Sequence, residues 1–180
     1  CRVGQYLNMM IESSKRCYGY AEKLMAGIRP EQAARKPHFE TSGALKVVDT
    51  NHPTFCFGHL ALYPEKILSL VGVDPSSVAT PANWTELFSA GKPCQDDTEG
   101  KIYPPFAEVS AAFLKHMNTV YAELAKVDDA VLNTPTNHER YRAFLPVTGM
   151  AVNFMLNAHI MMHAGQVSAW RRCFDMPGVL

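Results

Sequence analysis

The chain has 180 residues, a mass of 20.0 kDa and 47% hydrophobic residues, which predicts a single globular domain spanning residues 1–180. Seventeen basic side chains balance seventeen acidic ones, so the composition gives no sign of a nucleic-acid-binding surface. No apolar run approaches the roughly 20 residues that span a bilayer, and no secretory signal is visible, so we expect no membrane segment.

The chain contains five cysteines, an odd number, and none of them forms a Cys-x-x-Cys pair. Disulfide frameworks usually use an even number of cysteines in secreted proteins, whereas free thiols are normal in the reducing cytosol. Free thiols and a cytoplasmic location are therefore the simpler interpretation.

The first predicted helix covers residues 3–28, because apolar side chains recur there at helical spacing. Pro30 ends this helix and turns the chain, since proline cannot continue the hydrogen-bond pattern. Residues 31–50 have a mixed pattern, for which we expect a short helical piece followed by a loop through Pro37.

The second predicted helix covers residues 51–70, where His59 lies among apolar residues at helical spacing. Pro64 interrupts this segment and predicts a kink, or an end to its first part. Residues 78–105 form a long connection in which we expect one helical turn from Trp84 onward. Such a loop is either one wall of a functional site or a crossover that only joins two helix ends.

The third and fourth long helices are predicted at residues 105–127 and 152–172, and residues 128–146 connect them. We find no convincing alternating strand pattern and no internal repeat. The predicted fold class is therefore all-α, namely a four-helix bundle with long connecting loops.

The fourth helix carries three polar side chains, His159, His163 and Gln166, on an otherwise apolar face. Polar groups on a core face cost free energy unless they are paired. Two imidazoles four residues apart have Cβ atoms roughly 5–6 Å apart, so both rings can reach one metal ion. The alternative is a pair of partly buried histidines that bond to backbone or water.

Two short motifs resemble the DinB superfamily: Gly58-His59-Leu60 in the second helix, and His-x-x-x-His-x-Gly-Gln-Val at residues 159–167. The resemblance implies a four-helix bundle, often dimeric, in which His59, His159 and His163 bind one divalent metal ion. Three neutral ligands leave coordination positions open, which is typical of catalytic rather than closed structural sites. Zinc is favoured on ligand type, with nickel, iron and manganese as alternatives.

Some members of this family are thiol S-transferases or isomerases that use low-molecular-weight thiols such as bacillithiol or mycothiol. The resemblance therefore implies a metal-dependent enzyme, a thiol S-transferase or a related isomerase or hydrolase, with a small-molecule substrate and a homodimeric assembly. The metal would lower the pKa of a bound water or thiol at neutral pH. The alternative is a non-catalytic helical binding or interaction protein whose metal is structural or absent.

Three further residues near these motifs are candidates for a supporting role. Cys56 precedes His59 by three positions and could be a ligand or nucleophile, although a buried core cysteine is favoured. Gln166 lies one turn beyond His163 and could bond the second nitrogen of a ligand. His52 lies seven residues before His59, roughly 10.5 Å along a helix, which is too far to share one ion. It belongs at a pocket mouth or near the helix start.

Overall fold

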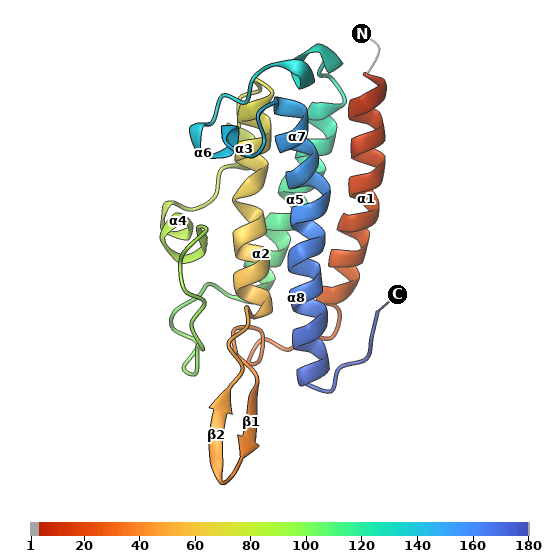
Figure 1. The fold of residues 1–180 in the computed structure, drawn as a ribbon. Coiled ribbons are helices and arrows are strands. Elements are labelled where there is room, and N and C mark those ends of the chain that lie inside the picture. Colours follow the sequence, from red (N-terminus) through yellow and green to blue (C-terminus); the bar gives the residue numbers. More distant parts are fainter. Residues whose placement is uncertain (1–3, 180) are drawn as a thin grey trace.

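The computed structural model describes residues 4–179, apart from the side chain of Arg140. The chain is predominantly helical, and its long helices lie side by side (Figure 1). The helices are α1 (Gln5–Met25), α2 (Pro53–Ala61), α3 (Tyr63–Leu70), α4 (Ala82–Phe88), α5 (Phe106–Leu124), α6 (Glu139–Arg142), α7 (Thr148–Asn153) and α8 (His159–Cys173). A π-helical segment, Phe154–Ala158, joins α7 to α8, and short 3₁₀ turns occupy Ser76–Val78 and Asp129–Asn133.

The helices expected from the sequence are present with small shifts at their ends. The first and third predicted helices are confirmed as α1 and α5. Of the two outcomes expected at Pro64, the structure shows an end to the first part, because the second helix is divided at Leu62 into α2 and α3. The turn expected from Trp84 onward corresponds to α4, and the last helical stretch begins at Thr148, earlier than predicted.

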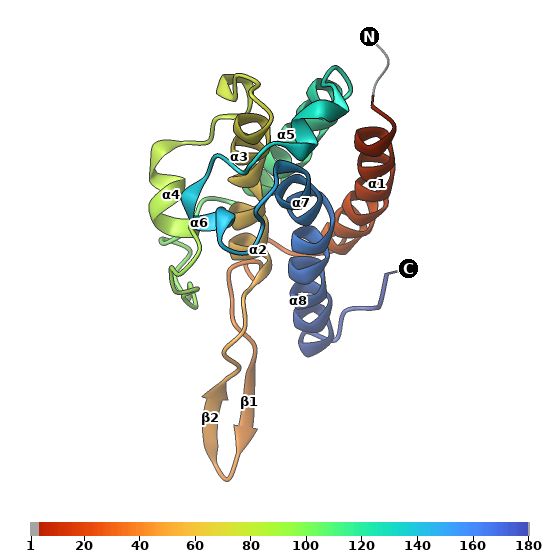
Figure 2. The same cartoon turned by 45° about the horizontal axis from the view of Figure 1, so that its top comes forward.

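The all-α prediction is wrong in one respect, because residues 38–47 form an antiparallel hairpin. Strand β1 (His38–Thr41) pairs with β2 (Ala44–Val47), and the hairpin projects away from the helices in both views of the fold (Figures 1 and 2). Ser42 and Gly43 at its tip both have positive φ, as a two-residue type I′ turn requires. The short helical piece expected within residues 31–50 is absent, and turns occupy residues 30–34 instead.

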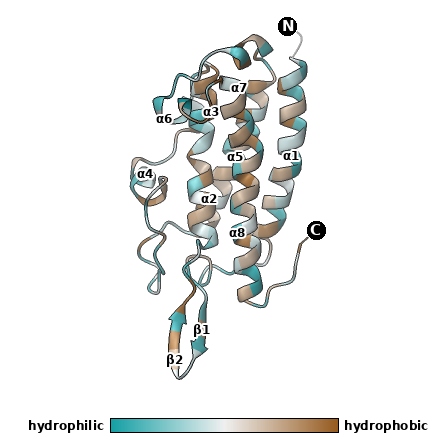
Figure 3. Cartoon of the chain, in the orientation of Figure 1, coloured by the Kyte–Doolittle hydropathy of each residue, from teal (hydrophilic) through white to brown (hydrophobic). Residues whose placement is uncertain are grey.

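The hairpin escaped prediction because neither of its faces is buried. A strand with one face on a core alternates apolar and polar residues, whereas every residue of β2 is exposed. Leu45 and Val47 are exposed apolar side chains, and Figure 3 shows the hydrophobic colour of β2 outside the packed helices. The pattern that reveals most strands is therefore missing here.

Helix α2 lies at the centre of the packing. All nine of its residues are buried, and it contacts α5 on one side and α8 on the other. A helix that is apolar all round is expected only where neighbours cover every face. The polar ring of His59 is therefore embedded between helices. Among the described residues, no helix is both long enough and apolar enough to cross a bilayer.

His52 is the cap at the start of α2. Its Nδ1 accepts a hydrogen bond from the backbone N–H of Phe55 at 3.1 Å, and its Nε2–H donates to the Gln95 carbonyl at 3.0 Å. A second proton would have to bind Nδ1, which already serves as an acceptor. Burial lowers the pKa of His52 to about 4, in agreement with this geometry. The expectation that His52 lies near the helix start is confirmed.

This buried neutral cap predicts an acid-sensitive contribution to stability. Between pH 6.5 and about 4 the unfolded chain binds a proton at His52 that the folded chain excludes, so the free energy of unfolding decreases as the pH falls. The loss from this residue is about 3 kcal/mol. His52→Asn keeps a capping acceptor without a titrating ring. Urea unfolding at pH 7 and pH 4 should show that the free energy of unfolding decreases by about 3 kcal/mol less in the variant than in the wild-type protein. An equal decrease in both proteins would contradict the assignment.

Candidate metal centre

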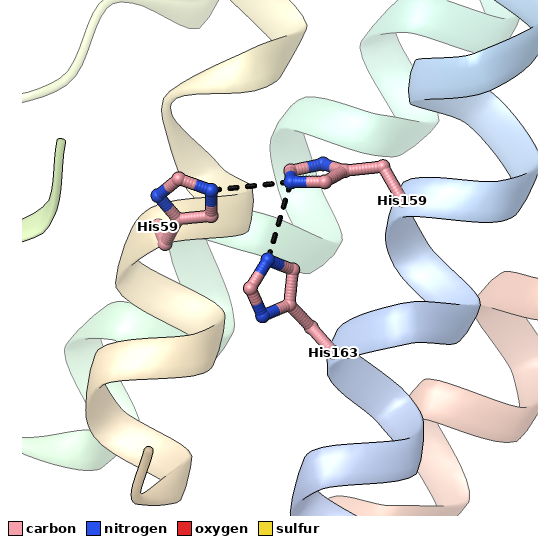
Figure 4. A group of neighbouring side chains, drawn as sticks. All are labelled: His59, His159 and His163. Atoms are coloured by element: carbon pink, nitrogen blue, oxygen red, sulfur yellow. Dashed lines mark hydrogen bonds between the residues drawn. The ribbon is translucent and has the colours of Figure 1, made fainter. Parts of the chain in front are cut away.

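Three buried histidine rings converge between α2 and α8 (Figure 4). The Nε2 atom of His159 lies 3.1 Å from Nε2 of His59 and 3.2 Å from Nε2 of His163. One nitrogen from each ring lies within 4.8 Å of the other two. The structure thus brings together the pair spaced by four residues on one helix and the third histidine from a distant helix.

The π-helical segment Phe154–Ala158 ends directly before His159. A π-turn holds more residues than an α-turn, so it changes the rotational position of everything that follows on the helix. Here it sets the direction in which the histidine face of α8 points relative to α7. Such segments occur frequently at functional sites.

Hydrogen bonds fix which nitrogen carries the proton on two of the rings. Nδ1–H of His59 donates to the backbone carbonyl of Phe88 at 2.7 Å, and Nδ1–H of His163 donates to Oε1 of Gln166 at 2.9 Å. A carbonyl oxygen can only accept, so both Nδ1 atoms are protonated. Both Nε2 atoms therefore direct a lone pair into the centre of the cluster.

The amide of Gln166 is held in place by its own contacts. Its Oε1 also accepts from Nδ2 of Asn51 at 3.2 Å and from Sγ of Cys56 at 3.5 Å. Three donors around one oxygen decide the orientation of the amide. Burial raises the pKa of the Cys56 thiol well above its usual value, so the sulfur keeps its proton. Cys56 therefore supports Gln166 and lies outside the group of convergent nitrogens.

The three histidines suit a divalent metal ion in chemistry and in spacing. Two nitrogens at tetrahedral angles, each about 2.0–2.1 Å from one ion, are roughly 3.3 Å apart, close to the 3.1 and 3.2 Å that separate Nε2 of His159 from those of His59 and His163. Burial, followed by the neighbouring imidazoles, lowers the pKa of His159 far below its usual range, and burial lowers that of His163. Both rings are therefore neutral, which is the form that binds metals.

His159 has the least satisfied ring of the three. Its Nδ1 is buried without a hydrogen-bond partner among the described residues. Because His59 and His163 both present lone pairs, His159 can only donate through Nε2–H, which leaves Nδ1 as a bare buried acceptor. One N–H of His159 cannot fully satisfy two lone pairs, whereas a cation at the centre would accept the lone pairs of all three Nε2 atoms; Nδ1 of His159 has no described partner in either case. The donor set therefore fits a metal better than it fits a hydrogen-bonded cluster.

A cleft of about 350 Å³ lies against the three histidines. Residues 89–92 form part of its lining, so of the two alternatives for the long connection after α3, the structure favours the one in which it forms a wall of the cleft. Its remaining described walls are mostly aromatic and include Phe55, Tyr63, Tyr141, Phe144 and Phe154. The cleft gives a small molecule access to the nitrogen cluster.

Sequence reasoning missed two supports of this site. The acceptor for His59 is the main-chain carbonyl of Phe88, a group that every residue possesses, so no sequence signal distinguishes it. Asn51, just before α2, donates a hydrogen bond to the Gln166 amide on α8. Its position beside the His-Pro start of α2 was the only sequence feature that pointed to this contact. Both contacts depend on tertiary packing.

Gly58 precedes His59 and allows α4 to approach α2. A Cβ at this position would lie 2.5 Å from the Phe88 ring, so Gly58→Ala must displace the residue whose carbonyl holds His59. We expect a loss of about 1–3 kcal/mol in the free energy of unfolding and about 10-fold weaker metal binding. Urea unfolding and metal titration would measure both effects.

Gly165→Ala is the matched control, because a Cβ at Gly165 would meet nothing within 4 Å. Alanine is a better helix former than glycine, so this variant should be more stable by about 0.5–1 kcal/mol, with unchanged metal affinity. Equal behaviour of the two variants would show that the close approach of Phe88 has no role in the site.

Fold and cluster together define a predominantly helical protein with a buried three-nitrogen ligand set beside an accessible cleft. A sequence model of the DinB superfamily matches residues 15–167, a range that contains the three histidines and Gln166. The chain belongs to the DinB superfamily. Searches of curated proteins and of solved structures found no significant match.

Proposed function

We propose that this protein is a divalent-metal-dependent enzyme in which His59, His159 and His163 bind one ion. The observation that carries the proposal is the convergence of three buried Nε2 atoms, two of them with lone pairs fixed by carbonyl acceptors. Zinc is the favoured ion for imidazole ligands, and nickel, iron and manganese are alternatives.

The bound ion would supply a positive charge that lowers the pKa of a coordinated water or thiol and polarises an electrophile. The chain supplies the rest. Phe88 and Gln166 hold two of the imidazoles in their ligating tautomer, and neutral ligands leave the full charge of the ion available to an anion. The aromatic walls of the cleft limit the access of water.

We infer that the substrate is a small molecule and that the reaction is thiol S-transfer or a related isomerisation or hydrolysis. In S-transfer, the sulfur of a low-molecular-weight thiol forms a bond to an electrophilic carbon and loses its proton. The bond between that carbon and its leaving group breaks, and the leaving group departs with the electron pair. The proton lost by the thiol balances the charge of the departing group. A cleft of about 350 Å³ is within the size range of small-molecule sites.

The test is consumption of a thiol by the metal-loaded protein. Wild-type protein loaded with zinc, nickel, iron or manganese would be mixed with a low-molecular-weight thiol and an alkylating electrophile, and the loss of free thiol would be followed. Turnover above the rate of the ion alone, absent in His159→Ala, supports the proposal. Stoichiometric metal without turnover for any thiol would favour a binding protein with a structural metal.

The same family membership supports two further parts of the proposal, a four-helix bundle architecture and a homodimeric assembly, and the free thiols of the described cysteines support a cytoplasmic location. The bundle would consist of α1, α2 with α3, α5, and α7 with α8, which lie side by side. Sedimentation velocity measures the assembly directly, and a species with the mass of one chain would contradict the dimer.

A further inference from the structure

A second pocket, of about 280 Å³, adjoins the histidine cleft. The two cavities share Ser89 and Tyr141 in their linings, so these residues stand at the boundary between them. Unlike the aromatic cleft, the second pocket is rich in polar side chains, among them Glu65, Lys66, Ser69, Thr85, Asn137 and His138. The two pockets are therefore neighbours.

Lys66 lines the second pocket and contacts Tyr63, which lines the histidine cleft. Its Nζ lies 4.3 Å from the centre of the Tyr63 ring, and the Tyr63 ring centre lies 4.0 Å from that of His159. The phenol ring of Tyr63 thus contacts both the ammonium of Lys66 and the imidazole of His159.

We propose that the second pocket is a substrate subsite that binds a carboxylate through Lys66, while the other end of the same molecule reaches the histidine cleft. This inference rests on the proposed function, because it assigns the substrate class of that site. The substrate would be a small carboxylic acid that carries its reactive group, such as a thiol, several bonds from the carboxylate.

The polar residues favour a single negative charge. Lys66 is half-buried, and a partly desolvated ammonium attracts a carboxylate more strongly than an exposed one does. Asn137 and Ser89 add uncharged polar groups. Glu65, which is exposed, adds a negative charge to the lining and would repel a dianion more strongly than a monoanion.

Lys92 provides the internal comparison. It is exposed and lines the histidine cleft, and it is not among the described residues that line the second pocket. If charge alone near the histidines selected anions, Lys92 would do so as well as Lys66. If the carboxylate binds in the second pocket, the preference for the anion should instead depend on Lys66 and not on Lys92.

The experiment uses Co²⁺-loaded protein and two probes of equal length, 6-mercaptohexanoate and 6-mercapto-1-hexanol. Cobalt content is measured first, and binding is followed through the thiolate-to-cobalt absorption band. We expect wild-type protein to bind the acid at least 10-fold more tightly than the alcohol. Lys66→Met, which keeps most of the side-chain length, should reduce this preference to less than about twofold, and Lys92→Met should retain it.

A wild-type protein without preference, or a preference that survives Lys66→Met, would overturn the subsite. If no cobalt binds, the proposed function fails, and hexanoate is then titrated into the metal-free protein by NMR. Binding that Lys66→Met weakens at least 10-fold would sustain the carboxylate subsite on its own. Hexanoate binding that is absent or independent of Lys66 would overturn it. Thermal melts of both variants confirm that each is folded.

Discussion

Replacing His159 with alanine is expected to abolish stoichiometric binding of a divalent metal ion while the protein stays helical. The Nε2 of His159 is the nitrogen nearest to both other rings, at 3.1 and 3.2 Å, so its loss leaves two ligands on opposite helices. Loss of a residue that only orients a ligand already costs about 10–100-fold in metal affinity. Loss of the ligand itself should therefore cost at least about 100-fold, measured by competition with a chelator.

His38→Ala is the control for this variant, because His38 lies in β1, with its Nε2 3.3 Å from Oδ2 of Asp96, and is not part of the three-histidine cluster. It should bind the metal like the wild-type protein. Circular dichroism should show the same helical content in both variants. Metal retained at one equivalent in His159→Ala would exclude the three-histidine assignment.

Replacing Arg171 with methionine is expected to lower the free energy of unfolding strongly. Arg171 is 3% exposed, and its guanidinium donates from Nη1 to the carbonyls of Leu24 and Ala26 at 3.0 and 2.6 Å. Nη2 donates to the carbonyl of Pro177 at 3.0 Å. The cation thus satisfies the C-terminal end of α1, where the helix dipole is negative, and ties the final segment to it.

Methionine would fill much of the same space but leave the buried carbonyl of Leu24, and the partly buried bonds to Ala26 and Pro177, without this donor. Hydrogen bonds to a charged group contribute more than neutral ones, so we expect a loss of about 3 kcal/mol in the free energy of unfolding. That corresponds to a melting temperature roughly 6–12 °C lower for a chain of this size. The neighbouring Arg172 is exposed, and Arg172→Met should change stability by no more than about 0.5 kcal/mol. Similar melting temperatures for the two variants would contradict this account of Arg171.

Much of the helical arrangement was predictable because periodicity reports burial. Helices α1 and α5 each bury one face, and the spacing of their apolar residues located them to within a few positions. Pro64 located the break between α2 and α3, since proline lacks the N–H that a continuous helix needs. The hairpin at residues 38–47 buries neither face, so its sequence carried no such periodicity.

The candidate site was predictable in its histidines and not in their supports. His159 and His163 were informative because a spacing of four places both on one helical face, and His59 entered through its family motif. The proximity of His59 to that pair depends on the packing of α2 against α8. The Phe88 carbonyl and the pocket next to Lys66 arise from α4 and the loop after α5 meeting the other helices, which no local pattern encodes.

The most direct test of the central claim is elemental analysis of protein purified without a metal-affinity tag. We predict about one equivalent of a transition metal per chain in the wild-type protein, held by His59, His159 and His163, and far less in His159→Ala. No bound metal, together with no rise in melting temperature on adding zinc, nickel, iron or manganese, would contradict the metal-dependent function. The convergent imidazoles would then be a structural feature of an interaction protein.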